Sequence, residues 1–168
     1  MKDITAEVQE AVARSGIKNG ICSVYSPHTT CCVRVNEFET GFLEDFAQLL
    51  KQLVPSDNYY AHDDWDRRTE NICPEDMDFG NGHSHCMAML LGTAGESIPV
   101  RDGELCLGTW QRVLFLELDR ERDRRWLVQV VGVWHFPRSI RNLRKQIPDA
   151  EPIKGQLRST DLRLSFVR

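Results

Sequence analysis

Residues 20–36 read Gly20-Ile21-Cys22-Ser23-Val24-Tyr25-Ser26-Pro27-His28-Thr29-Thr30-Cys31-Cys32-Val33-Arg34-Val35-Asn36, two apolar runs on either side of a short polar turn. Both runs are rich in Val, Ile, Cys and Tyr, and Val33 and Val35 alternate with Arg34, as in a half-buried strand. The pattern therefore predicts two strands, at 20–26 and 31–36, with His28 at their connection.

Two helices are expected on either side of this pair. Asp3 can cap a helix that ends at Gly16, because apolar residues recur at every fourth position after it. Residues 39–53 form the clearest helical pattern, which Pro55 stops. Its apolar stripe, which we expect to pack in the core, consists of Phe42, Phe46, Leu49, Leu50 and Leu53.

The second half of the chain predicts a long loop and more strands. Residues 55–82 hold many Asp, Asn, Pro and Gly residues, which indicates a loop, and loops of this length are commonly functional. A helix is expected from His83 to Leu91, with Asn81 as its cap and Gly92 at its end. Strands are expected at 98–100 and 104–107, as a hairpin, and at 110–118 and 126–134. The fold class predicted is α+β, a mixed or antiparallel β-sheet sandwich with a few helices.

Length and composition favour one globular domain. The 168 residues are 41% hydrophobic and 27% charged, and no apolar run approaches the length of a membrane span. Because the N-terminus has no secretory pattern, we expect a cytoplasmic protein whose six cysteines are reduced core residues.

The net charge of -4 is unevenly distributed. Residues 134–168 carry eight Lys or Arg and three Asp or Glu, which leaves the rest of the chain at -9. No aromatic and basic recognition motif accompanies this basic tail, so nucleic-acid binding is not expected.

Three histidines stand beside hydroxyl, amide or carboxylate side chains at the borders of apolar segments: His28, His62 and His85. Histidine is the usual metal ligand or proton carrier near neutral pH, so we expect one polar site built from distant parts of the chain. Three imidazoles also match the ligand count of a catalytic zinc site, which makes them candidate ligands for a divalent metal, Zn or Mg. On a helix His83 and His85 point apart, and we expect His85 to enter the site and His83 to face solvent.

Two further pairs of polar residues are candidates for this site. Thr29 and Thr30 can offer hydroxyl and backbone N–H groups to an anion, or only cap a neighbouring element. Asn36 and Glu37 can supply an amide and an acid or base, or cap the following helix.

Several short motifs, in this order and spacing, resemble the YjbQ-like family, often labelled secondary thiamine-phosphate synthase. They are His28-Thr29-Thr30 with Asn36-Glu37, Asn81-x-x-x-His85 leading into Leu90-Leu91-Gly92, Asp102-Gly103-Glu104-Leu105-x-Leu107-Gly108-Thr109-Trp110-Gln111, and Glu117-x-Asp119-x-x-Arg122. The resemblance covers residues 3–133 and places a domain at 1–133, followed by a basic C-terminal extension at 134–168.

The resemblance implies a homotrimer that joins a pyrimidine diphosphate to a thiazole phosphate and releases pyrophosphate. It implies that His28, Glu37 and His85 are catalytic. The residues implied to contact substrate are Thr29, Thr30, Asn36, Asn81, Thr109, Gln111 and Arg122. A metal-assisted phosphoester hydrolase and a non-catalytic trimeric protein that binds a ligand or metal remain the alternatives.

The chain differs from the family pattern at both ends. Members usually begin with a strand, whereas this sequence starts almost directly on the helix after Asp3, so that strand is expected to be missing. Residues 162–166 alternate like a strand, and we expect them to fill the vacant position in the sheet.

Overall fold

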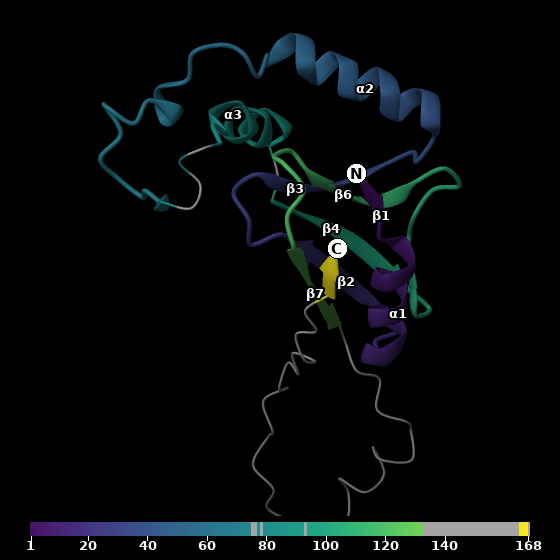
Figure 1. Ribbon diagram of the computed structural model, residues 1–168. Helices are drawn as coiled ribbons and strands as arrows, with labels where there is room; N and C mark the ends of the chain where they lie inside the picture. Colours follow the sequence, from purple (N-terminus) through teal and green to yellow (C-terminus); the bar gives the residue numbers. More distant parts are fainter. Residues whose placement is uncertain (75–76, 78, 93, 133–164, 168) are drawn as a thin grey trace, which may run out of the picture.

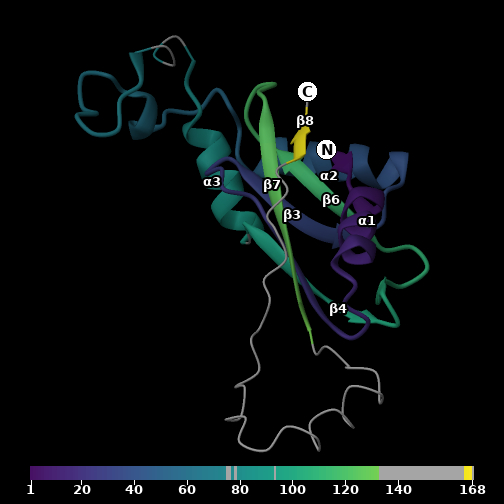
Figure 2. The same ribbon diagram turned by 90° about the horizontal axis from the view of Figure 1, so that it is seen from below.

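The computed structural model describes residues 1–74, 77, 79–92, 94–132 and 165–167, the last three by their backbone alone. Two antiparallel sheets form the body of the described chain, with strand orders β1-β6-β3 and β5-β4-β2-β7-β8 (Figures 1 and 2). The strands are β1 (Lys2–Asp3), β2 (Gly20–Tyr25), β3 (Cys31–Asn36), β4 (Gly95–Arg101), β5 (Glu104–Leu105), β6 (Arg112–Glu117), β7 (Arg124–Gly132) and β8 (Ser165–Val167). The helices are α1 (Thr5–Ser15), α2 (Thr40–Leu53) and α3 (Gly82–Leu91), with a 3-10 turn, η1 (Ala61–Asp63). The predicted α+β sandwich of antiparallel sheets is confirmed.

The main core lies between the two sheets and α1. Ile4, Val8 and Val12 come from one face of α1 and its N-cap, and all three are buried. The Asp3 carboxylate accepts the Thr5 N–H at 2.9 Å, and Gly16 ends the helix in the left-handed region with φ +68°. Asp3 and Gly16, the local signals that predicted this helix, therefore also mark its two ends.

The central strands also follow the sequence pattern. β2 pairs with β4 and β7, while β3 pairs with β6, so the turn around His28 passes from one sheet to the other. The expected hairpin is present as β4 and β5. Its turn places Asp102 and Gly103 at positive φ, which Asn, Asp and Gly adopt most readily.

Helix α2 corrects one expectation. Its Glu39 cap accepts the N–H groups of Gly41 and Phe42, and the helix lies over the face of the three-stranded sheet that points away from the core (Figure 1). The apolar stripe is core only in part: Leu50 is buried and Phe46 packs against a buried apolar cluster, whereas Leu49 is 49% exposed and Leu53 is 62% exposed. Periodicity predicts an apolar face, but it does not say whether the same chain covers that face.

Both chain ends contribute short strands. β1 pairs with β6, and β8 pairs with β7 in the other sheet. The position beside β6, expected to be vacant, is therefore held by Lys2 and Asp3, and the C-terminal strand joins a different edge. Most of the extension, residues 133–164, lies outside the described residues, including the first part of the strand expected at 162–166.

The cysteines divide into two groups. Cys22, Cys31 and Cys32 are buried, whereas Cys73, Cys86 and Cys106 are exposed, and all six are free thiols. The expectation that they are core residues therefore holds for half of them. No described helix is long and apolar enough to cross a membrane.

Candidate functional site: an arginine-lined cavity at the strand ends

A cavity of about 840 Å³ lies where the strand ends meet α3 and the segment after α2. Seven of the residues singled out from the sequence line it: His28, Thr29, Thr30, His62, Asn81, His85 and Arg122. They meet because β2 ends, β3 begins, β6 ends and β7 begins at the same edge, as the pairings Tyr25–Leu127 and Cys31–Glu117 show. The expectation that three distant histidines share one cavity is therefore confirmed.

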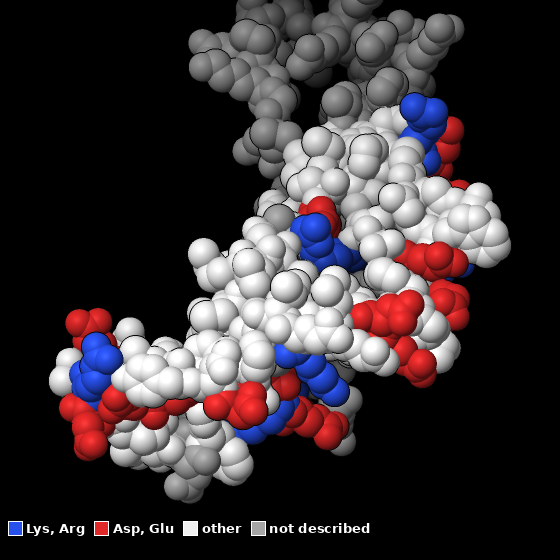
Figure 3. All heavy atoms as spheres, turned by 90° about the horizontal axis from the view of Figure 1, so that it is seen from above, with Lys and Arg blue, Asp and Glu red and all other residues white. Residues whose placement is uncertain are grey.

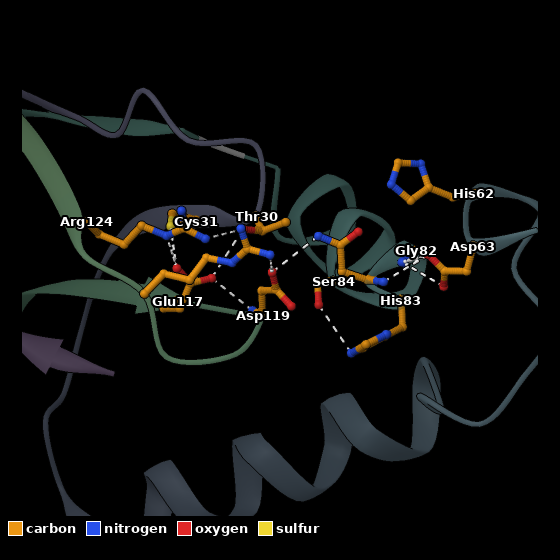
Figure 4. Close-up of polar contacts among 12 residues, drawn as sticks. Thr30, Cys31, His62, Asp63, Gly82, His83, Ser84, Glu117, Asp119 and Arg124 are labelled. Atoms are coloured by element: carbon orange, nitrogen blue, oxygen red, sulfur yellow. Dashed lines mark hydrogen bonds and ion pairs between the residues drawn. The ribbon is translucent and has the colours of Figure 1, made fainter. Parts of the chain in front are cut away.

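Glu117, at the end of β6, organises one wall of the cavity (Figure 4). One carboxylate oxygen accepts from the Thr30 hydroxyl at 3.2 Å and from the Asp119 N–H at 2.9 Å. The other accepts from the Cys31 thiol at 3.3 Å and from the Arg124 guanidinium. Arg124 also donates to the Thr30 hydroxyl, so the carboxylate fixes both side chains at the cavity wall.

The Cys31 thiol serves this wall as a hydrogen-bond donor. Burial and the neighbouring Glu117 carboxylate raise the pKa of the Cys31 thiol to about 12. The thiol therefore stays protonated near neutral pH and has little nucleophilic character.

Asp119 joins this wall to α3. Its carboxylate contacts the Arg122 guanidinium at 3.1 Å and accepts from the Asn81 side-chain amide at 3.2 Å. Asn81 stands at the N-cap position of α3, as expected, but its side chain makes no cap hydrogen bond and donates to Asp119 instead.

Asp63 supplies the cap of α3 from the segment between the helices. Its carboxylate accepts the N–H groups of Asn81 at 2.9 Å and of Gly82 at 3.0 Å (Figure 4). A carboxylate is favourable here because the first N–H groups of a helix have no partner within the helix and carry partial positive charge. This contact places η1, and with it His62, against the start of α3.

Position 82 requires a glycine because Tyr60 and Asp63 pack closely against it. Gly82→Ala is therefore expected to destabilise the protein. A Cβ at this position would lie 2.6 Å from the Tyr60 Cβ and 3.1 Å from the Asp63 carboxylate. Overpacking of this kind costs about 1–3 kcal/mol, which exceeds the gain of about 1 kcal/mol from replacing a helical glycine by alanine.

Urea unfolding measures the free energy of unfolding for this variant, with Gly41→Ala in α2 as the matched control. There the added Cβ meets only the flexible end of Glu39, at 3.2 Å. We expect Gly41→Ala to be neutral or stabilising. Equal effects of the two substitutions would contradict the close packing of α3 on Tyr60.

His62 and His85 form a pair on the side of the cavity opposite Glu117. Their ring centroids are 4.5 Å apart and the rings are tilted by 56°. Burial, followed by the nearby His62, lowers the pKa of His85. Its imidazole is therefore neutral near pH 7 and can accept a proton.

His28 lies near the start of β7. Its Nε2 accepts the Arg125 backbone N–H at 3.2 Å, and burial together with Arg124 lowers its pKa. His83 differs from expectation, because it is half-buried against Tyr60 with its Nδ1 inaccessible to solvent. Met89, one helical turn after His85, is 83% exposed.

The lowered pKa values of His28 and His85 predict a pH-dependent stability. At a pH between the lowered pKa of the folded protein and the ordinary pKa of 6.5, the two rings are protonated in the unfolded chain but neutral in the folded chain. The free energy of unfolding is therefore highest above pH 6.5, and it decreases as the pH is lowered below 6.5.

Urea midpoints between about pH 7 and about pH 5.5 test this expectation, in a window above the range in which exposed carboxyl groups titrate. His85→Gln is expected to reduce the pH dependence. A variant with an unchanged pH dependence, or a wild type that becomes more stable on acidification, would contradict it.

Four residues predicted for the site lie outside the cavity. They are at or just beyond the ends of β3 and β6 that point away from it: Asn36, Glu37, Thr109 and Gln111. Since Asn36 pairs with Arg112 while Cys31 pairs with Glu117, five strand residues, roughly 17 Å, separate the two ends. Asn36 accepts the Glu37 N–H and Gln111 accepts the Gly108 N–H, so both side chains shape local turns. The prediction that Glu37 joins His28 and His85 in one site is wrong for the single chain.

The cavity residues do not fit a divalent metal. Among the described residues, no group of three or more His, Cys, Asp and Glu side chains is arranged to hold an ion. The Nε2 atoms of His28 and His62 already accept hydrogen bonds, and a lone pair used in this way is not free to bind a metal. The lining contains four arginines and two carboxylates, a charge balance that favours an anion.

Several residues at the site were not singled out from the sequence: Asp63, Arg68, Glu117, Asp119 and Arg124. Most are charged residues that act on partners far along the chain, which a local pattern does not indicate. Glu117 and Asp119 belong to the motif Glu117-x-Asp119-x-x-Arg122 at the end of the strand predicted at 110–118, and this motif was the available signal.

The fold and cavity define a protein of two antiparallel sheets whose strand ends form an arginine-lined cavity. Residues 1–133 match the model of a family described as UPF0047 protein YjbQ-like, and the chain belongs to this family. A UPF0047 protein of Archaeoglobus fulgidus is 40% identical over 129 residues, 77% of this chain and 89% of the relative. One of Methanothermobacter thermautotrophicus is 39% identical over 130 residues, 77% and 81% of the two chains.

Solved structures agree with this assignment. A Sulfolobus solfataricus protein described as being of unknown function has a TM-score of 0.67 and 35% identity, covering 79% of this chain and 86% of that one. An uncharacterised protein of Clostridium acetobutylicum has a TM-score of 0.65 and 32% identity, covering 77% and 88%. These likenesses show the fold and the family, and the printed descriptions assign no activity.

Proposed function

We propose that the protein is an enzyme that binds a phosphorylated small molecule in the arginine-lined cavity and acts at the phosphorylated group. The observation that carries this proposal is the arrangement of Arg122, Arg124 and Thr30 on one wall, facing the neutral His85 on another. Guanidinium donors held in fixed positions, here with Thr30 bridging Arg124 and Glu117, stabilise phosphoryl oxygens, and a neutral imidazole can take up a proton.

Within this class, we propose the activity that the family resemblance implies. A pyrimidine diphosphate and a thiazole phosphate are joined, and the bond to the departing pyrophosphate breaks. The negative charge that develops on pyrophosphate requires donors that are in place before the reaction, and Glu117 holds the Arg124 guanidinium in this way. As the carbon–oxygen bond to pyrophosphate breaks and the carbon–nitrogen bond to the thiazole ring forms, the neutral His85 can take up a proton from an amino group of the pyrimidine.

Turnover assays on wild type and His85→Ala test the proposal, with metal content measured on protein purified without added metal. Release of pyrophosphate only when both substrates are present is expected, with a loss of roughly 10²–10⁴-fold in the variant. Cys86→Ala, an exposed neighbour on α3, is the matched control. Metal-dependent release of inorganic phosphate would instead identify a hydrolase, and saturable binding without turnover would identify a binding protein.

We also propose that the protein functions as a homotrimer in the cytoplasm. The exposed Leu49 and Leu53 on α2 supply apolar surface for contact between copies, and Figure 3 shows broad uncharged areas on the face seen from above. Light scattering coupled to size-exclusion chromatography should give three times the chain mass. A mass equal to one chain would contradict the assembly and leave the proposed chemistry to be judged by the turnover assays.

A further inference from the structure

His62 enters the cavity on a turn that is fixed at two points. Asp63, the next residue, binds the N–H groups at the start of α3, and the His62 ring lies against His85 at a centroid distance of 4.5 Å. The ring is half-buried and lines the cavity. What it can do there depends on which ring nitrogen carries the proton.

Arg68 determines this. Its Nη1 lies 3.1 Å from the His62 Nε2, and a guanidinium has donors but no acceptor. The Nε2 atom must therefore accept, which leaves Nδ1 to carry the proton of the neutral ring.

The guanidinium of Arg68 is held independently of the ring. It donates to the carbonyl oxygens of His62 and Glu70, each at 3.1 Å, and of Asn71 at 2.6 Å. It also lies over the Trp65 ring, 5.3 Å from the centroid. Because these contacts fix Arg68, the donor that faces the His62 Nε2 is in place whether or not a ligand is bound.

We propose that Arg68 is a positioning residue that fixes His62 as the neutral Nδ1–H tautomer, so that His62 offers a hydrogen-bond donor to an anion in the cavity and does not act as a base. The anion-binding part of this inference rests on the proposed function, and the tautomer part does not. The inference divides the roles within the histidine pair, because the proton-accepting role then belongs to His85. Its surroundings agree, since burial and Arg68 both lower the pKa of His85.

Nitrogen-15 NMR of the imidazole groups in the full-length protein without ligand tests the tautomer directly. The wild-type spectrum is expected to show His62 protonated at Nδ1. Arg68→Met, which keeps the aliphatic part of the side chain and removes every donor, is expected to move the population toward the Nε2–H form. Arg67→Met is the matched control, because Arg67 donates to the Tyr59 hydroxyl and not to His62.

The outcomes separate the inference from the proposed function. An Nε2–H ring in the wild type overturns the inference, and this result needs no variant to fold. An unchanged tautomer in folded Arg68→Met overturns the role of Arg68. In the wild type, added pyrophosphate is expected to shift the His62 Nδ1 signal. If it shifts other cavity signals but not this one, the donor role is wrong, whereas if it shifts none of them, the proposed function is wrong.

Discussion

Glu117→Ala is expected to lower the free energy of unfolding by about 3 kcal/mol, because removing one member of a largely buried ion pair leaves the other charge without compensation. The Glu117 and Arg124 side chains are only 18% and 12% exposed, and the carboxylate also accepts from Thr30, Cys31 and Asp119. Urea unfolding monitored by circular dichroism measures the loss.

Glu104→Ala provides the matched control for this substitution. Glu104 is an exposed acid in β5, at the far end of a hairpin from the cavity. Surface substitutions of this kind change stability by at most about 0.5 kcal/mol. If the two variants were equally stable, Glu117 would not hold the cavity wall together.

Arg124→Met is expected to weaken binding of pyrophosphate by roughly 10–100-fold, the equivalent of losing one or two hydrogen bonds to a charged group. Arg124 lines the cavity and its contacts with Glu117 and Thr30 hold the guanidinium in place, so its remaining N–H groups can bind an anion. Isothermal titration calorimetry measures the change, on protein first shown by circular dichroism to be folded.

The control for this experiment is Arg112→Met, which removes the same charge at the opposite end of β6, where the guanidinium lies 3.9 Å from the Asp3 carboxylate. It is expected to leave the dissociation constant within about twofold of wild type, since exposed charges several strand residues away are screened by salt. Equal weakening by the two substitutions would mean that only the overall charge matters and that the cavity is not the site.

The fold was largely predictable because its signals are local. The alternation of Val33 and Val35, the cap at Asp3 and the terminating Gly16 each act within a few residues, and the structure uses all three. Whether the rest of the chain covers the apolar face of α2 was not predictable in the same way. Whether Leu53 is buried depends on which surface faces it, and spacing along one helix does not contain that information.

The site was predictable in part, for a reason that concerns strand geometry. Polar residues at the borders of apolar segments indicated the His28 turn and His85. Antiparallel pairing places the turn at one edge of the sheets, and α3, held to Asp119 by Asn81, brings His85 to the same cavity. The same reasoning applied to Glu37 failed, although the sequence held a warning. Six extended residues separate Thr30 from Glu37, and a strand of that length keeps its two ends apart.

The contacts of Glu117 and Arg68 were beyond sequence reasoning for a different reason. Glu117 meets Thr30 across 87 residues of chain, and Arg68 binds carbonyl groups whose direction is set by an irregular segment. Such contacts depend on the tertiary structure, and no periodic pattern marks them.

Titration of the wild-type protein with pyrophosphate, followed by NMR of the histidine and arginine side chains, most directly tests whether this cavity binds a phosphorylated anion. Saturable shifts confined to His28, His62, His85, Arg122 and Arg124 are the predicted result, because these side chains line one cavity. An absence of shifts there, or shifts of equal size at distant arginines such as Arg14 and Arg112, would contradict it.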